Sequence, residues 1–154
     1  MSRGALYEFK QNLDNVGTAV ISDFDGYIDH EFDYLLEEDP TKYINDFLQE
    51  LKRYEIPTGT VVSESTETVI PFFEITEEGK KNFFRERLSC LKEQISTLSL
   101  EEFITTHVAW NLCTFIDDPF AEAVTTDDTD FQTLDRFIRT ASGRYYIGKV
   151  FFMS

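Results

Sequence analysis

The chain has little of what most enzyme, metal and membrane sites require. Its 154 residues include two cysteines, two histidines, one tryptophan and four prolines. Two cysteines are too few for a disulfide scaffold or a zinc site, and His30 and His107 do not make a confident catalytic pair. No apolar run approaches the roughly 18 residues of a membrane-spanning helix, and no basic start with a long apolar run marks a signal peptide. We therefore expect a cytoplasmic protein in which Cys90 and Cys113 are buried free thiols inside helices.

Basic residues are also scarce. Fourteen Lys and Arg stand against 29 Asp and Glu, which gives a formal net charge of −15 at pH 7. Nucleic acids and anionic membranes are polyanions, so this charge disfavours direct binding to either of them. The negative charge favours a basic protein as the partner. The alternative is that the charge only keeps the protein soluble and selects no partner.

Apolar residues are plentiful enough for a core. They make up 42% of the chain and aromatic residues 15%, including fifteen Phe. A chain of this length and composition is expected to form one acidic globular domain over residues 1–154.

Periodicity and turn signals predict the order of the elements. Helices are expected over residues 4–16, 18–38, 41–55, 76–98, 99–116 and 130–141. Strands are expected over residues 58–64, 68–75 and 144–153, with the last pairing with the hairpin of the first two. Pro71 favours an edge strand or a bulge. The fold class is thus α+β: a mostly helical single domain with a small antiparallel sheet of two to three strands.

Two of the expected helices have distinctive faces. The helix over 76–98 has an apolar stripe from Phe84 to Leu98 beside the only strongly basic surface of the chain (Lys80, Lys81, Arg85, Arg87 and Lys92). The helix over 99–116 is apolar over a wide arc that includes Trp110, so we expect it to be central.

The strongest functional signal is a row of acidic residues in the stretch from Thr18 to Glu38. Read as a helix, this stretch has an apolar stripe formed by Ile21, Phe24, Ile28, Phe32 and Leu35. Beside the stripe lie four carboxylates spaced four residues apart: Asp25, Asp29, Asp33 and Glu37. Like charges at this spacing cost about 0.2–0.5 kcal/mol per pair, so the row is self-repulsive in the free protein. The row is either a binding surface for a basic partner or a solvated acidic face.

A second acidic cluster follows the helix expected over 99–116. Its members are Asp117, Asp118, Glu122, Asp127, Asp128, Asp130 and Asp135, and no Lys or Arg intervenes from the first to the last. Five of them are expected to contact a partner: Asp117, Asp118, Asp127, Asp128 and Asp130. Part of this cluster is expected to serve turns and helix caps, with Asp128 at the start of the helix over 130–141. The other carboxylates of this cluster add to the concentration of negative charge on one part of the protein.

The run Asp23-Phe24-Asp25-Gly26, preceded by Ala-Val-Ile-Ser, resembles the first motif of haloacid-dehalogenase-type phosphatases. The resemblance implies that Asp23 is a nucleophile and Asp25 a general acid, with a magnesium ion between them. Tyr27 stands where that family has a small hydroxyl residue, and the apolar stripe runs through the motif at helical period. The spacing of the acidic residues is not that of an EF-hand loop either. We therefore expect no enzyme activity, no catalytic residue, no metal and no cofactor, and a phosphatase of this type that uses Asp23 and Asp25 is the alternative from a different functional class.

In general character the chain is similar to immunity proteins of bacterial contact-dependent and other polymorphic toxin systems. Those proteins are small, single-domain, cytoplasmic and often acidic, and they have no catalytic motif. The resemblance implies an inhibitor that occludes the basic active site or nucleic-acid groove of its partner, a cognate nuclease toxin. The alternative in the same class is a phage-type nucleic-acid mimic that acts on a host DNA-binding enzyme.

Overall fold

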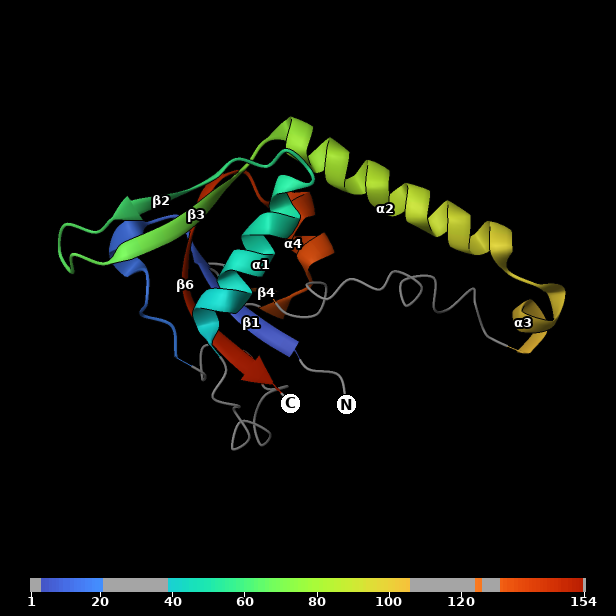
Figure 1. The fold of residues 1–154 in the computed structure, drawn as a ribbon, viewed down its shortest axis with the longest axis horizontal. Coiled ribbons are helices and arrows are strands. Elements are labelled where there is room, and N and C mark those ends of the chain that lie inside the picture. The colour runs from blue at the N-terminus through green and yellow to red at the C-terminus, as the bar shows by residue number, and fades with distance from the viewer. Residues whose placement is uncertain (1–3, 21–38, 106–123, 126–130, 154) are drawn as a thin grey trace.

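The computed structural model describes residues 4–20, 39–105, 124–125 and 131–153, and it shows an α+β fold (Figure 1). The strands form one sheet in the order β2-β3-β6-β1-β4-β5. Their bounds are β1 (Gly4–Lys10), β2 (Thr58–Val62), β3 (Val69–Ile75), β4 (Val124–Thr125), β5 (Phe131–Gln132) and β6 (Gly143–Met153). The four strands from β2 to β1 are antiparallel, and the short β4 joins β1 in parallel. The sheet is therefore larger than the expected two or three strands, whereas the pairing of the last strand with the hairpin is confirmed.

Four α-helices accompany the sheet in the described residues. They are α1 (Pro40–Lys52), α2 (Glu77–Thr97), α3 (Leu100–Thr105) and α4 (Leu134–Thr140), with a 3-10 turn at Leu13–Asn15. None of these helices is long and apolar enough to cross a membrane.

The helices begin where the sequence places capping side chains. Asp39 caps α1 with Pro40 in the first turn, and Thr76 caps α2. Ser99 and Glu102 form the expected capping box of α3, with reciprocal hydrogen bonds of 3.1 and 2.9 Å. The prediction that Asp128 caps the last helix is wrong, because α4 begins at Leu134 and Thr133 is its N-cap. The Thr133 hydroxyl accepts a hydrogen bond from the backbone N–H of Arg136.

The N-terminal segment departs most from expectation. Residues 4–16 have apolar side chains at helical spacing, yet they form β1 and the 3-10 turn. The four consecutive side chains of residues 6–9 are all buried. A strand that is covered on both faces buries such a run, whereas a surface helix would leave part of it in water.

The helices cover one face of the sheet and enclose an aromatic core. Phe9 of β1 lies at its centre, with ring centroids 5.5 Å from Phe47 of α1, 4.9 Å from Phe73 of β3 and 5.2 Å from Phe137 of α4. Phe83, near the start of α2, also belongs to this cluster. The core therefore joins segments from both ends of the chain.

Pro71 does not lie in an edge strand, as the sequence suggested, because β3 is flanked by β2 and β6. It pairs with Thr60 of β2, but the pairing of β3 with β6 begins only at Phe72. Only one neighbouring strand thus flanks Pro71, which limits the effect of its missing N–H group.

The second half of α2 and all of α3 form an arm that projects from the body (Figure 1). Only Gly79 and Phe83 of α2 are buried. Cys90 is exposed, which corrects its expected burial, and Cys113 lies outside the described residues. In α3, Leu100, Phe103 and Ile104 are 74%, 57% and 71% exposed, so this part of the helix expected over 99–116 is not central. The arm extends beyond the body, and among the described residues it meets no second layer.

The phenol of Tyr7 gives a prediction about this core. Its oxygen is buried and has no hydrogen-bond partner among the described residues, and its ring stacks on Phe47 at 4.9 Å. Burial, and then the nearby Tyr43 and Asp46, raise the pKa of Tyr7 above its ordinary value. We expect Tyr7→Phe to leave the free energy of unfolding unchanged or to raise it by up to about 1 kcal/mol, because it removes an unpaired buried hydroxyl. Urea denaturation measures this, and a loss of about 1 kcal/mol or more would contradict it.

Candidate functional site

The residues that the sequence assigns to partner binding all lie outside the described residues. They are Asp25, Asp29, Asp33, Glu37, Asp117, Asp118, Asp127, Asp128 and Asp130. The same holds for Asp23 of the phosphatase-like motif and for His30, His107 and Trp110. The helix expected over 18–38 is described only at residues 18–20, which are neither helix nor strand.

The acidic excess of the protein is concentrated in those same segments. Thirteen of the 29 Asp and Glu lie in residues 21–38, 106–123 and 126–130, which contain no Lys or Arg. The described residues hold the other sixteen, against thirteen Lys and Arg. Several of these charges pair with one another: Arg53 with Glu50 and Glu86, Arg139 with Asp135, and Arg144 with Glu74. The body is thus nearly balanced, and the negative field belongs to the segments attached to it.

A buried carboxylate anchors the first of these segments at its root. Oε1 of Glu8, in β1, accepts hydrogen bonds from the backbone N–H groups of Gly17, Thr18 and Ala19 at 3.0, 3.2 and 3.3 Å. Its Oε2 accepts a bond of 3.0 Å from the backbone N–H of Lys149 in β6. Charge-assisted hydrogen bonds of this kind are stronger than neutral ones, so one side chain ties residues 17–19 to the centre of the sheet.

The sheet is irregular where Glu8 is bound. Tyr7 pairs with Val150 and Phe9 with Ile147, so Gly148 and Lys149 together oppose Glu8. This is a β-bulge, in which the extra residue leaves the regular ladder. The backbone N–H of Lys149, at this irregularity in the register, donates its hydrogen bond to the Glu8 carboxylate.

The carboxylate also requires a glycine opposite it. A Cβ at Gly148 would lie 2.5 Å from Oε2 and 2.8 Å from the carboxyl carbon of Glu8. Gly17, at the other side of the anchor, has a φ of +84°, a conformation that favours glycine. These two glycines and Glu8 therefore form one unit, which we call the Glu8 anchor.

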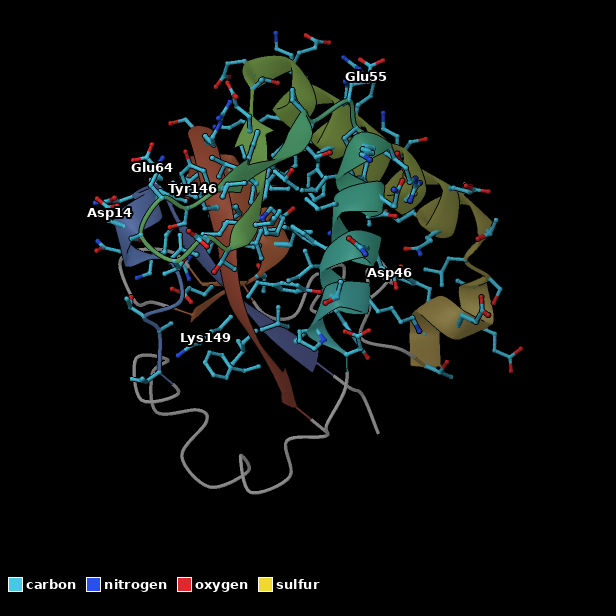
Figure 2. The ribbon with its side chains drawn as sticks, turned by 60° about the vertical axis from the view of Figure 1, so that its left-hand side comes forward. Asp14, Asp46, Glu55, Glu64, Tyr146 and Lys149 are labelled. Atoms are coloured by element: carbon cyan, nitrogen blue, oxygen red, sulfur yellow. The ribbon has the colours of Figure 1, made fainter. Side chains whose placement is uncertain are left out.

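Two further bonds hold the loop that leaves the anchor. The ammonium group of Lys149 donates a bond of 3.0 Å to the carbonyl of Ala19, and the Thr18 hydroxyl donates one of 2.6 Å to the carbonyl of Asn15. Figure 2 shows Lys149 beside the N-terminal loop that it holds. The position and direction of the chain at Ala19 are thus set by β1 and β6, immediately before the acidic stretch begins.

Sequence reasoning missed the Glu8 anchor. A helix over 4–16 with its apolar face at Leu6, Phe9 and Leu13 would place Glu8 off that face. The signal in the sequence is an acidic residue between Tyr7 and Phe9. In a strand that is buried on both faces, such a residue must find donors.

An open groove of about 520 Å³ lies between the 3-10 turn and the β2–β3 hairpin. Its lining consists of Leu13, Asp14, Val61, Val62, Ser63, Glu64 and Ser65. Figure 2 shows Asp14 and Glu64 on this side of the molecule together with Tyr146. The lining offers two carboxylates and two serine hydroxyls, and it contains no histidine, lysine or cysteine. In the described part of the chain, no three His, Cys, Asp or Glu side chains come together as a metal-binding group.

Comparison of the chain with protein-family models, with curated proteins and with solved structures gave no match.

Proposed function

We propose that the protein is an acidic inhibitor that binds a basic protein through the carboxylates of residues 21–38 and 106–130. A cognate bacterial nuclease toxin is the partner that fits best, which makes the protein an immunity protein. The observation that carries the proposal is the separation of charge: thirteen carboxylates without a single Lys or Arg lie in segments attached to a nearly balanced body.

The Glu8 anchor supports this proposal. A buried carboxylate with four backbone donors determines where the stretch over 21–38 leaves the sheet. At its other end, the Asp39 cap and Pro40 begin α1, which packs on the core through Phe47 and Leu51. Both flanks of the acidic stretch are thus held to the body, by Glu8 on one side and by α1 on the other.

The mechanism is occlusion guided by charge. A nuclease cleft binds a polyanion and therefore exposes Lys and Arg side chains. Carboxylates on this protein attract that cleft, speed the encounter and disfavour partners of the wrong charge. Binding also relieves the mutual repulsion of Asp25, Asp29 and Asp33, whose spacing makes them neighbours if the stretch is helical.

Charge reversal of the acidic row tests the proposal. The set Asp25→Lys, Asp29→Lys and Asp33→Lys is expected to slow association with the cognate nuclease by at least about tenfold and to weaken its salt dependence, because steering charges are lost. Association rates at two salt concentrations measure both effects.

The matched control reverses three exposed carboxylates of the body, Glu64→Lys, Glu67→Lys and Glu93→Lys, with the same change in net charge. This control is expected to slow association much less. Equal slowing by both sets would show that net charge alone matters. The milder pair Asp29→Asn and Asp33→Asn is expected to leave the free protein as stable as before, or more stable by a few tenths of a kcal/mol. Unfolding of that pair would mean that the row is structural.

A further inference from the structure

The arm formed by α2 has an apolar seam with coiled-coil spacing. Phe84, Leu88, Leu91, Ile95 and Leu98 follow one another at steps of four, three, four and three residues. These are alternating d and a positions of a heptad, with Leu at the d positions 91 and 98. Phe84 lies at the body end, where the guanidinium of Arg139 stacks on its ring at 4.4 Å. Further out, Leu88 and Ile95 are 51% and 48% exposed.

The charges of α2 are sorted around this seam. The flanking e and g positions carry Arg85, Arg87, Lys92 and Gln94, and the f positions on the opposite side carry Glu86 and Glu93. Glu86 pairs with Arg53 of the body. Arg85 and Lys92 are exposed, and neither is paired with a carboxylate of the described residues. On the g side, Arg87 is half-buried and its guanidinium lies over the Phe83 ring at 4.9 Å. An apolar seam with an exposed basic edge, formed by Arg85 and Lys92, is therefore presented on a helix that projects from the body (Figure 1).

We propose that this seam, from Phe84 to Leu98, docks an amphipathic helix of a partner protein whose apolar stripe is flanked by Asp and Glu. The seam supplies the apolar a and d contacts, and Arg85 and Lys92 supply complementary charge at the e positions. These basic side chains attract an acidic helix and repel a basic one.

A second copy of this chain fits the seam poorly. In a parallel pair, g positions of one helix face e positions of the other, which places Arg87 near Lys92. In an antiparallel pair, e faces e and g faces g, which again brings basic side chains together. The charge pattern thus selects a partner of opposite sign and works against self-association.

The inference does not depend on the proposed inhibitory function. The acidic segments would contact a basic protein, whereas the seam would contact an acidic helix on another surface. The exposed Leu100, Phe103 and Ile104 of α3 lie beyond the outer end of the seam.

The test uses the full-length protein and two synthetic heptad peptides of equal length. Both peptides carry Leu at a and d, and they differ in having Glu or Lys at all e and g positions. We expect the Glu peptide to bind at least tenfold more tightly in a fluorescence-anisotropy titration. Amide hydrogen exchange is expected to slow in residues 84–98 when the Glu peptide binds. Binding by neither peptide, or equal binding by both, would overturn the proposal.

Variants of exposed residues locate the contact. Leu88→Ser with Ile95→Ser is expected to weaken binding of the Glu peptide at least tenfold. The matched control, Ser89→Ala with Ser96→Ala, changes two exposed b positions of the same helix and is expected to leave the affinity within twofold. Arg85→Glu with Lys92→Glu is expected to transfer the preference to the Lys peptide. Circular dichroism confirms that each variant is folded.

Two outcomes identify a different occupant and overturn the proposal. If the seam variant leaves peptide binding unchanged, the peptide binds elsewhere on the protein. If sedimentation shows a dimer that Leu88→Ser with Ile95→Ser dissociates, a second copy of the chain occupies the seam.

Discussion

Replacement of Glu8 by alanine is expected to lower the free energy of unfolding by about 3 kcal/mol. The four backbone N–H groups that donate to the Glu8 carboxylate lose their acceptor, and each buried donor left unpaired costs about 1–3 kcal/mol. The total is smaller than the sum because Gly17 and Thr18 are exposed and can bind water once the carboxylate is gone. For a chain of this size the expected loss corresponds to a fall in Tm of roughly 6–12 °C. Thermal and urea denaturation measure the change.

Two further variants separate the carboxylate from the shape of its site. Glu8→Gln keeps the size of the side chain and one acceptor oxygen but places an amide donor against a backbone donor, so an intermediate loss is expected. Gly148→Ala puts a methyl group within 2.5 Å of Glu8 Oε2 and is expected to cost about 1–3 kcal/mol. In Glu8→Ala that clash is absent, so the double variant is expected to lose less than the two single losses together. Additive losses, or a stable Glu8→Ala protein, would show that the carboxylate does not hold the loop.

Phe9→Ala is expected to cause the largest loss of stability, about 3–5 kcal/mol. The Phe9 ring is fully buried and contacts rings from α1, β3 and α4, so its removal leaves a cavity between three elements that cannot all move inward. Urea denaturation measures the loss. The matched control is Phe72→Ala, which also removes a phenyl ring, but from the other face of the sheet. There Phe72 is only half-buried and packs against Tyr146 and the guanidinium of Arg144. If Phe72→Ala costs as much as Phe9→Ala, the core is not centred on Phe9.

Local sequence determined the elements whose signals lie within the element itself. Asp39-Pro40 and Thr76 mark the starts of α1 and α2, and the apolar faces of these helices follow within a few turns. The β2–β3 hairpin, α4 and β6 were also predicted in the order in which they occur. Caps, turns and periodicities act between residues a few positions apart, so one chain segment contains all the information.

Only the tertiary structure decided the features that depend on distant segments. Residues 4–10 have a pattern compatible with a helix, and they form a strand because β6, some 140 residues later, supplies the partner. The same pairing brings Lys149 of β6 to the Glu8 carboxylate and so creates the Glu8 anchor. Conversely, α3 and the outer part of α2 have apolar faces that the sequence would assign to a core, yet these faces lie on the arm. Burial depends on which surfaces meet in three dimensions, and periodicity shows that a face is apolar without showing what covers it.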